Sequence, residues 1–195
     1  MCDRKQTIES GETMEKKRIA WAITGAGYAL EDCVGVLLKL AGADVFLSRA
    51  GDEVLRKYRL DARLDRPGLR VYREKSASSP LVGRFFAGDY QLLVIAPATS
   101  NSVAKFVHGI SDSLITNLFA QAGKSRVPIL VYPTDLVPEA ESIGPRGESV
   151  KVYPREIDIE NTARLRALKG VCVVDGWEEL ERCLSTALVT KPNQK

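Results

Sequence analysis

The segment that decides the fold runs from Ala96 to Asn117 and reads APATSNSVAKFVHGISDSLITN. It follows Tyr90–Ile95 (YQLLVI), a short apolar run typical of a strand that is buried on both faces of a parallel sheet. We expect Pro97 to end this strand, because proline has no amide proton to donate and its ring fixes φ. Residues 99–102 (TSNS) then place four short polar side chains at the start of a helical pattern. A buried strand, a polar turn and a helix N-terminus predict a site for a polar ligand, and a capped helix without a ligand is the alternative.

A second turn of the same kind lies earlier in the chain. The apolar run Ile19–Ile23 leads into Thr24–Tyr28 (TGAGY), and a helical pattern follows over Leu30–Ala41. Glycines in such a turn let the backbone approach a ligand closely, and the N–H groups of the first helical turn favour an anion.

The turn does not carry the full dinucleotide-binding fingerprint. Only Gly25 and Gly27 are present, and no third glycine follows at the expected place. The next predicted strand, Asp44–Leu47, ends in Ser48-Arg49-Ala50, where a dinucleotide fold would place an acidic residue for the ribose. A small hydroxyl and a cation suit a phosphate better than a ribose diol. Ser48 is also a candidate cap for a helix over residues 51–58, and the two roles are compatible.

Strands and helices alternate along the rest of the chain. Helical patterns are predicted up to about Ala122, over 161–168 and over 177–188, and strands over 127–132, 150–153 and 171–174. Residues 59–89 are less regular, and no strand is predicted there. The alternation predicts an α/β fold: a single-domain parallel sheet, Rossmann-like and flavodoxin-like, with helices on both faces.

The domain organisation follows from the same patterns. Residues 1–15 are polar and without periodicity, so they are predicted to be a disordered N-terminal tail, and Met14 is an alternative natural start. The domain is predicted over 16–190, with a mobile loop over 139–151 that is rich in glycine and charge.

Composition excludes several classes of function. The 195 residues suit one domain, and the net charge of +3, without a basic stripe interleaved with aromatics, gives no support for nucleic-acid binding. No apolar run is long enough to cross a membrane and no secretory signal is present, so a cytoplasmic location is expected. Four widely spaced cysteines and a single histidine, His108, argue against a zinc site, an iron–sulfur cluster and a Ser-His-Asp triad. No metal is expected.

Three strand ends therefore carry polar turns of small residues: Thr24 to Gly27, Ser48 to Ala50, and Pro97 to Ser102. Ligands of open parallel sheets bind at the carboxyl ends of the strands. One turn with backbone donors, one with a hydroxyl and one rich in polar side chains suit a mononucleotide with a polar chain. From these residues alone, we predict that the ligand is a phosphorylated cofactor.

The motif PATSNSVAK (97–105) followed by GISDSLIT (109–116) resembles the signature of the FMN-binding flavoprotein superfamily of cysteine decarboxylases. The other two turns match the remaining FMN contacts of that superfamily in order and spacing, and the resemblance covers roughly residues 17–135. It implies bound FMN, held between the subunits of trimers or assemblies of trimers. The cofactor-binding residues that it implies are Gly25, Ala26, Gly27, Ser48, Arg49, Thr99, Ser100, Asn101 and Ser102.

Two departures separate this chain from the decarboxylases. Their catalytic histidine has no counterpart in residues 53–58 (EVLRKY), and their Pro-x-Met-Asn substrate clamp is replaced by Pro133-Thr134-Asp135. The start AWAITGAG (20–27) and the segment EIDIENT (156–162) instead resemble the branch of archaeoflavoproteins and acceptor-dependent dihydromethanopterin reductases.

That branch implies an FMN-dependent oxidoreductase that reduces dihydromethanopterin, a dihydropterin imine, to tetrahydromethanopterin by hydride transfer from reduced FMN. Asn101, His108 and Asp135 are the candidate catalytic residues: His108 and Asp135 as proton donors, and Asn101 as a hydrogen-bonding partner of the flavin or substrate. A structural position on its helix is the alternative for His108. The sequence identifies neither the electron donor nor a clear NAD(P)H site.

Two other functions stay open from the sequence. One is an electron-transfer flavoprotein that accepts electrons from a ferredoxin-like protein. The other is a lyase of the cysteine decarboxylase type, against which the missing histidine and clamp count.

Overall fold

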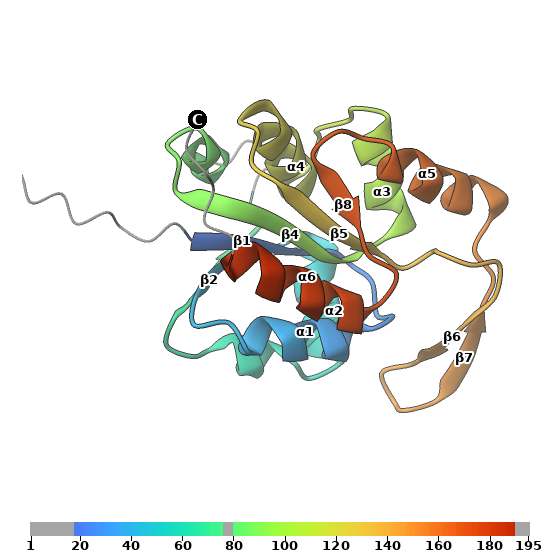
Figure 1. The fold of residues 1–195 in the computed structure, drawn as a ribbon. Helices are drawn as coiled ribbons and strands as arrows, with labels where there is room; N and C mark the ends of the chain where they lie inside the picture. Colours follow the sequence, from blue (N-terminus) through green and yellow to red (C-terminus); the bar gives the residue numbers. More distant parts are fainter. Residues whose placement is uncertain (1–17, 76–79, 190–195) are drawn as a thin grey trace, which may run out of the picture.

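A computed structural model of the chain describes residues 18–75 and 80–189. The predicted tail over residues 1–15 lies outside these residues. The central element is a six-stranded parallel sheet in the order β3-β2-β1-β4-β5-β8 (Figure 1). Its strands are β1 (Arg18–Ile23), β2 (Ala43–Leu47), β3 (Leu69–Arg73), β4 (Tyr90–Ala98), β5 (Ile129–Pro133) and β8 (Val171–Val173). The predicted α/β fold with a parallel sheet is confirmed.

Six α-helices cover both faces of the sheet (Figure 1). Those on one face are α1 (Leu30–Leu38), α2 (Arg49–Lys57) and α6 (Trp177–Val189), and those on the other are α3 (Ser100–Val107), α4 (Leu114–Lys124) and α5 (Glu156–Arg166). Two short 3₁₀ helices, η1 (Asp61–Leu64) and η2 (Pro80–Phe85), flank β3.

Alternate side chains of each strand supply the two cores. Trp21 of β1 is fully buried against the face of α1, whereas its neighbours Ala20 and Ala22 face α4. The second core also includes Phe106 of α3, whose ring stacks on that of Phe119 of α4 with the centroids 4.2 Å apart.

Strand β4 does not end at Pro97, contrary to the expectation from the sequence. It continues to Ala98, and its pairing with β5 shifts between Ile95 and Ala98. Pro97 has no amide proton to donate and lies where the pairing with β5 is irregular, and its carbonyl accepts hydrogen bonds from both the backbone N–H (3.3 Å) and the hydroxyl (2.9 Å) of Thr24.

The segment 139–151 was expected to be a mobile loop, and this expectation was wrong about its structure. It forms an antiparallel hairpin of β6 (Ala140–Ile143) and β7 (Ser149–Val152), which projects beyond the main sheet (Figure 1). The turn of the hairpin is closed by Gly147, which adopts a positive φ of 83° and donates its N–H to the carbonyl of Gly144.

Two further elements differ from the expectations. Strand β3 was not predicted, because its residues LRVYR carry arginines on an edge strand that is only half-buried. Helix α5 begins at Glu156 rather than near residue 161. Its first turn is closed by Asp158, whose carboxylate accepts a hydrogen bond from the backbone N–H of Arg155 (3.2 Å). Within the described residues no helix combines the length and apolar character needed to cross a membrane.

Candidate functional site

The three polar turns meet at the carboxyl edge of the sheet, as the sequence predicts. The first turn (24–28) follows β1, the second (48–51) follows β2, and the third (97–102) follows β4, on the other side of β1. Thr24 joins the first turn to the third, because its hydroxyl donates to the Pro97 carbonyl and accepts from the Thr99 N–H, both at 2.9 Å. Thr24 is buried, so these bonds are shielded from water.

The glycines of the first turn are required by the packing of the protein itself. A Cβ on Gly25 would lie 2.6 Å from the Cβ of Ala50, and one on Gly27 would lie 2.4 Å from the Tyr58 hydroxyl oxygen. Gly51 is restricted in the same way, since its Cβ would lie 2.4 Å from the Ile23 carbonyl oxygen. The first turn therefore packs directly on α2, and its residues Ala26 and Gly27 also line a cavity described below.

Two helix N-termini at this edge are suited to an anion. Ser48 caps α2 by accepting from the Gly51 N–H (2.9 Å), and Thr99 caps α3 by accepting from the Ser102 N–H (3.3 Å). The strands that lead into them flank β1, so the two N-termini are about 10 Å apart across the sheet. Each has N–H groups and hydroxyls, the donor set that binds a phosphate.

Helix α1 differs from these two helices. Its N-cap residue, Ala29, is in the left-handed region with no side-chain cap, and its first turn carries Glu31 and Asp32. Two carboxylates at a helix N-terminus satisfy its dipole and repel a second anion. The first turn of α2 also carries one acidic residue, Asp52, whereas that of α3 carries none, so by this criterion α3 is the helix best suited to an anion.

Glu74, immediately after β3, is a residue of this edge that the sequence analysis missed. Its carboxylate accepts from the Arg49 N–H (3.1 Å) and from the Leu114 N–H (2.6 Å), so it joins the N-termini of α2 and α4. Because β3 itself was not predicted, nothing placed an acidic residue at a strand end. The Arg49 amide is thus occupied, and the Gly51 and Asp52 amides donate to the Ser48 side chain and carbonyl. The Ser48 hydroxyl and the Ala50 amide are the donors of this turn that remain for a ligand.

Two cavities lie where this edge meets the β6–β7 hairpin. We call the first the turn cavity. Its volume is about 400 Å³, and its lining includes Ala26, Gly27, Thr99, Ser100, Thr134, Asp135 and residues of the hairpin. The second, the hairpin cavity, has a volume of about 610 Å³ and extends from Gly27 under the hairpin to Trp177. Both are lined by Tyr58, whose hydroxyl donates to the Ile143 carbonyl (3.1 Å). This hydrogen bond fixes the hairpin to the end of α2.

Asp135 is held by its neighbours in the turn cavity. The Thr134 hydroxyl donates to its carboxylate (2.9 Å), and the Thr162 hydroxyl of α5 donates to its backbone carbonyl (3.1 Å). The side chain is half-buried, which suits a group that exchanges protons with a bound molecule.

The other predicted catalytic residues lie outside the two cavities. Asn101 is exposed on the first turn of α3, next to Ser100. His108 is exposed at the C-cap of the same helix, about 12 Å along the helix axis from the polar turn. The structure therefore brings Asp135 to the polar turns, leaves Asn101 at their rim and separates His108 from them within one subunit.

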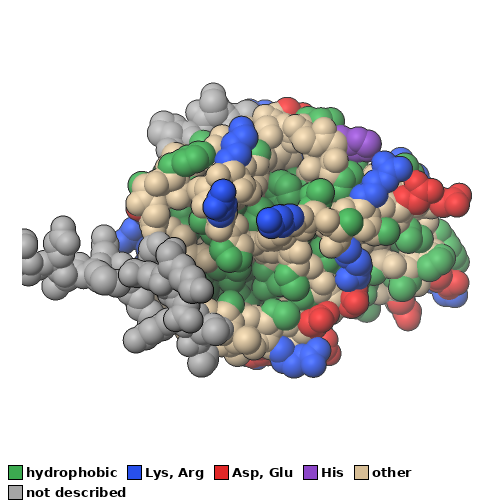
Figure 2. Space-filling model, turned by 45° about the horizontal axis from the view of Figure 1, so that its top comes forward, with side chains coloured by type: hydrophobic (Ala, Val, Ile, Leu, Met, Phe, Trp, Pro, Cys, Tyr) green, Lys and Arg blue, Asp and Glu red, His purple; other side chains and the backbone are tan. Residues whose placement is uncertain are grey.

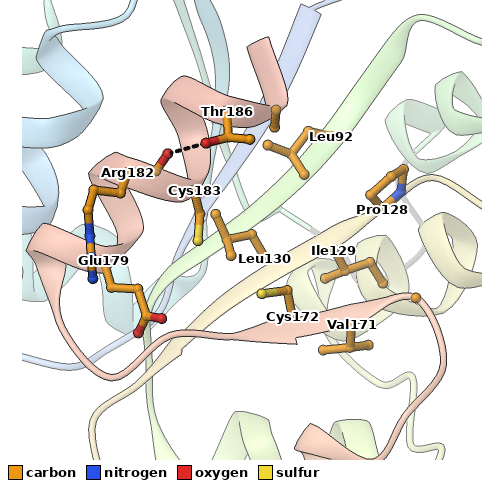
Figure 3. Close-up of a pocket in the computed structure, with 12 residues that line it drawn as sticks. Leu92, Pro128, Ile129, Leu130, Val171, Cys172, Glu179, Arg182, Cys183 and Thr186 are labelled. Atoms are coloured by element: carbon orange, nitrogen blue, oxygen red, sulfur yellow. Dashed lines mark hydrogen bonds between the residues drawn. The ribbon is translucent and has the colours of Figure 1, made fainter. Parts of the chain in front are cut away.

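A cavity of about 680 Å³ lies elsewhere, where α6 packs over the first residues of β5 and β8 (Figure 3). Its lining is mostly apolar and includes two free thiols, Cys172 and Cys183, and it opens as a green hollow on the face shown in Figure 2. It faces the amino edge of the sheet, away from the polar turns, and lacks their convergent donors. No group of three or more His, Cys, Asp or Glu side chains suited to a metal ion occurs among the described residues.

Comparison with known proteins agrees with this geometry. The sequence model of the Flavoprotein family matches residues 7–190. The chain is 36% identical over 184 residues to the uncharacterized protein MJ0730 of Methanocaldococcus jannaschii, covering 91% of this chain and 99% of the relative. It is 43% identical over 136 residues to the dihydromethanopterin reductase (acceptor) of Methanosarcina mazei. That match covers 63% of this chain and 57% of the reductase, so the chain spans little more than half of that relative's length.

Among solved structures, Burkholderia xenovorans DmrB in complex with FMN, described as a cubic protein cage for redox transfer, superposes with a TM-score of 0.79 at 39% identity. The superposition covers 88% of this chain and 95% of DmrB.

Proposed function

We propose that this chain, which belongs to the Flavoprotein family, binds FMN and is an oxidoreductase that reduces a dihydropterin of the dihydromethanopterin type. The observation that carries the proposal is the likeness to the FMN complex of DmrB, which extends over nearly the whole length of both chains. The identity to a dihydromethanopterin reductase gives the substrate class.

The residues at the carboxyl edge of the sheet fit FMN. The phosphate suits the Ser48 hydroxyl and the Ala50 amide of α2, with Arg49 supplying a positive charge nearby. Thr99, Ser100 and Ser102 supply hydroxyls and amides for the ribityl chain and the edge of the ring system, and Asn101 an amide at the rim. The tight packing of Gly25, Ala26 and Gly27 on α2 fixes the floor between them.

When bound, FMN supplies the hydride-transfer chemistry of the reaction. The protein contributes position, exclusion of water and a proton for the imine nitrogen. Of the two proton donors expected from the sequence, Asp135 is the one we propose, since it lines the turn cavity, whereas His108 lies at the far end of α3. Thr134 orients the Asp135 carboxylate through the 2.9 Å hydrogen bond described above.

The proposal includes partners. A homo-oligomer built from trimers follows from the resemblance, and an electron donor of unknown identity must reduce the flavin. The cytoplasmic location expected from the sequence is part of the same proposal.

The first experiment is the visible spectrum of the freshly purified protein, followed by denaturation and identification of the released flavin. Flavin absorption and released FMN support the cofactor assignment, and a colourless protein that also fails to bind added FMN contradicts it. The protein loaded with reduced FMN is then mixed anaerobically with dihydromethanopterin. We expect reoxidation of the flavin with formation of tetrahydromethanopterin.

Two outcomes would favour the other functions. Rapid flavin reduction by a reduced ferredoxin, without pterin turnover, would indicate an electron-transfer flavoprotein. Release of CO₂ from a cysteinyl substrate would indicate a lyase.

A further inference from the structure

The hairpin cavity has a chemistry distinct from that of the turn cavity. Its lining contains four large aromatic side chains, which come from four different elements: Tyr28, Tyr58, Tyr132 and Trp177. Tyr132 is buried at the end of β5, and Tyr28, in the turn after β1, lines the same cavity. Aromatic walls of this kind take a flat, conjugated ligand, because the faces of the rings pack against one another.

The carboxylates of α1 lie along the same cavity. Glu31 is paired with Arg63 (3.3 Å), but no cation pairs with Asp32 in the part of the chain that the structure describes. Asp32 is close to the Tyr132 hydroxyl and to Glu178 of α6. Partial burial raises the pKa of Asp32, and the negative charges of Glu31 and Glu178 raise it further. A ligand that brings hydrogen-bond donors to this carboxylate would relieve both effects.

Two conjugated rings, the pterin of the substrate and the flavin of FMN, are candidates for this cavity, and their polar edges decide which of them fits. The 2-amino-4-oxopyrimidine edge of a pterin presents an amino group and a ring N–H side by side, and these two donors match the two oxygens of a carboxylate. The corresponding edge of a flavin presents one N–H between two carbonyl oxygens, which a carboxylate repels. The carboxylate therefore favours a pterin over a flavin in this cavity.

We propose that the hairpin cavity is the subsite for the pterin ring of the substrate, packed among Tyr28, Tyr58 and Trp177 and with its amino-pyrimidinone edge bound by Asp32. The inference rests on the proposed function and adds to it the site of the substrate. The hairpin cavity adjoins the turn cavity at Gly27, Tyr28 and Tyr58, so a pterin in one lies next to a flavin in the other.

The test compares two ligands on the FMN-loaded protein by isothermal titration calorimetry, at a pH where both are neutral. Pterin carries the 2-amino group, and lumazine carries a carbonyl in its place. We expect the protein to bind pterin about tenfold more tightly than lumazine, the factor for one charge-assisted hydrogen bond. In Asp32→Asn this preference should disappear while the FMN content stays unchanged.

Two further variants distinguish recognition of the amino group by Asp32 from a general effect of charge and from packing against Trp177. Asp65→Asn makes the same change at an exposed position outside both cavities and should retain the preference. Trp177→Ala should weaken both ligands by a similar factor and leave their ratio intact. A preference that survives in Asp32→Asn, equal binding of the two ligands by the unmodified protein, or no binding of pterin at all would overturn the subsite.

The flavin assays distinguish failure of the subsite from failure of the proposed function. If dihydromethanopterin reoxidises the reduced flavin but the pterin preference is absent or insensitive to Asp32, the function stands and the subsite is wrong. If the protein holds no FMN or the flavin is not reoxidised, the proposed function fails.

Discussion

Thr24 is the residue on which the candidate site depends most directly. It combines a backbone N–H and a hydroxyl that both reach the Pro97 carbonyl, and the same hydroxyl receives the Thr99 N–H. One buried residue thus satisfies the Pro97 carbonyl and the Thr99 amide and sets the distance between the first and third turns. Serine keeps the hydroxyl at this position, whereas valine removes it and leaves the Thr99 amide unpaired.

The glycines of α1 and of the first turn allow a matched comparison. In Gly25→Ala the new Cβ meets the Cβ of Ala50 at 2.6 Å, so the turn must move away from α2. We expect a loss of about 1–3 kcal/mol of stability and weaker FMN binding. In Gly35→Ala the new Cβ has no atom within 4 Å and lies within a helix, so we expect a gain of about 0.5–1 kcal/mol. Thermal unfolding and flavin-fluorescence titration measure both, and unchanged FMN affinity in Gly25→Ala would contradict the role given to the first turn.

Asp44 allows a prediction about stability away from the site. Its carboxylate is fully buried in β2 and accepts from Arg18 (2.6 Å), Arg84 (2.8 Å) and the Tyr90 hydroxyl (2.9 Å). Asp44→Ala leaves two cations facing an empty, buried position, and we expect a loss of about 3–5 kcal/mol. Denaturant unfolding measures this loss. Asp65→Ala, at an exposed position just after η1, is the control and should change stability by less than about 0.5 kcal/mol.

At the scale of elements, the β6–β7 hairpin is held to α2 through one hydroxyl. Tyr58→Phe removes the hydrogen bond to the Ile143 carbonyl and retains the ring against Gly27. We expect the amides of β6 and β7 to exchange with solvent about fivefold faster, since a loss of about 1 kcal/mol favours local opening. Hydrogen–deuterium exchange of the holoprotein measures the effect. Tyr153→Phe, exposed after β7, is the control, and equal exchange in the two variants would show that Tyr58 does not fix the hairpin.

Helix α5 predicts a dependence of stability on pH. The guanidinium of Arg155 donates two hydrogen bonds to Asp158, at 2.9 and 2.8 Å, and holds the pKa of that carboxyl below its usual value. A carboxyl whose folded pKa is lowered stabilises the protein above its unfolded pKa, and this contribution is lost as the pH falls through the folded pKa. Asp158→Asn should therefore lose about 1 kcal/mol at neutral pH and show a shallower decline of stability in acid. Unfolding curves from neutral to acidic pH, with Glu156→Gln as control, measure the difference.

Elements with an apolar period were predictable from the sequence, and elements defined by pairing were not. The buried strands β1, β2, β4 and β5 are runs of apolar residues, and the turns after three of them carry polar motifs, so the sequence located both the sheet and the site edge. Strand β3 carries two arginines among its five residues at an edge of the sheet. The hairpin is stabilised by cross-strand pairs such as Glu141 with Ser149, which leave no local period in the sequence. The sequence therefore did not predict the part of the candidate site that the hairpin lines. Tyr58 is connected to this part through its hydrogen bond to Ile143, which lies 85 residues later in the chain.

At the scale of the whole molecule, the site joins segments distant in the sequence, so binding and folding are coupled. Residues of the first, second and third turns contact one another only in the folded chain, and FMN would contact all three. A ligand that binds only the folded state stabilises it by about 2.7 kcal/mol at a free concentration a hundred times its Kd.

This coupling predicts the effect of FMN on thermal stability. For a chain of this length about 1 kcal/mol corresponds to about 2–4 °C, so FMN at a hundred times its Kd should raise the Tm by about 5–11 °C. The shift should increase with FMN concentration, and Ser48→Ala should reduce it at fixed FMN because the α2 N-terminus loses its hydroxyl. The same variant measured without FMN corrects for the loss of the helix cap itself. A Tm that does not respond to FMN in the unmodified protein would mean that the three turns do not bind the cofactor together, even though they meet at one edge of the sheet.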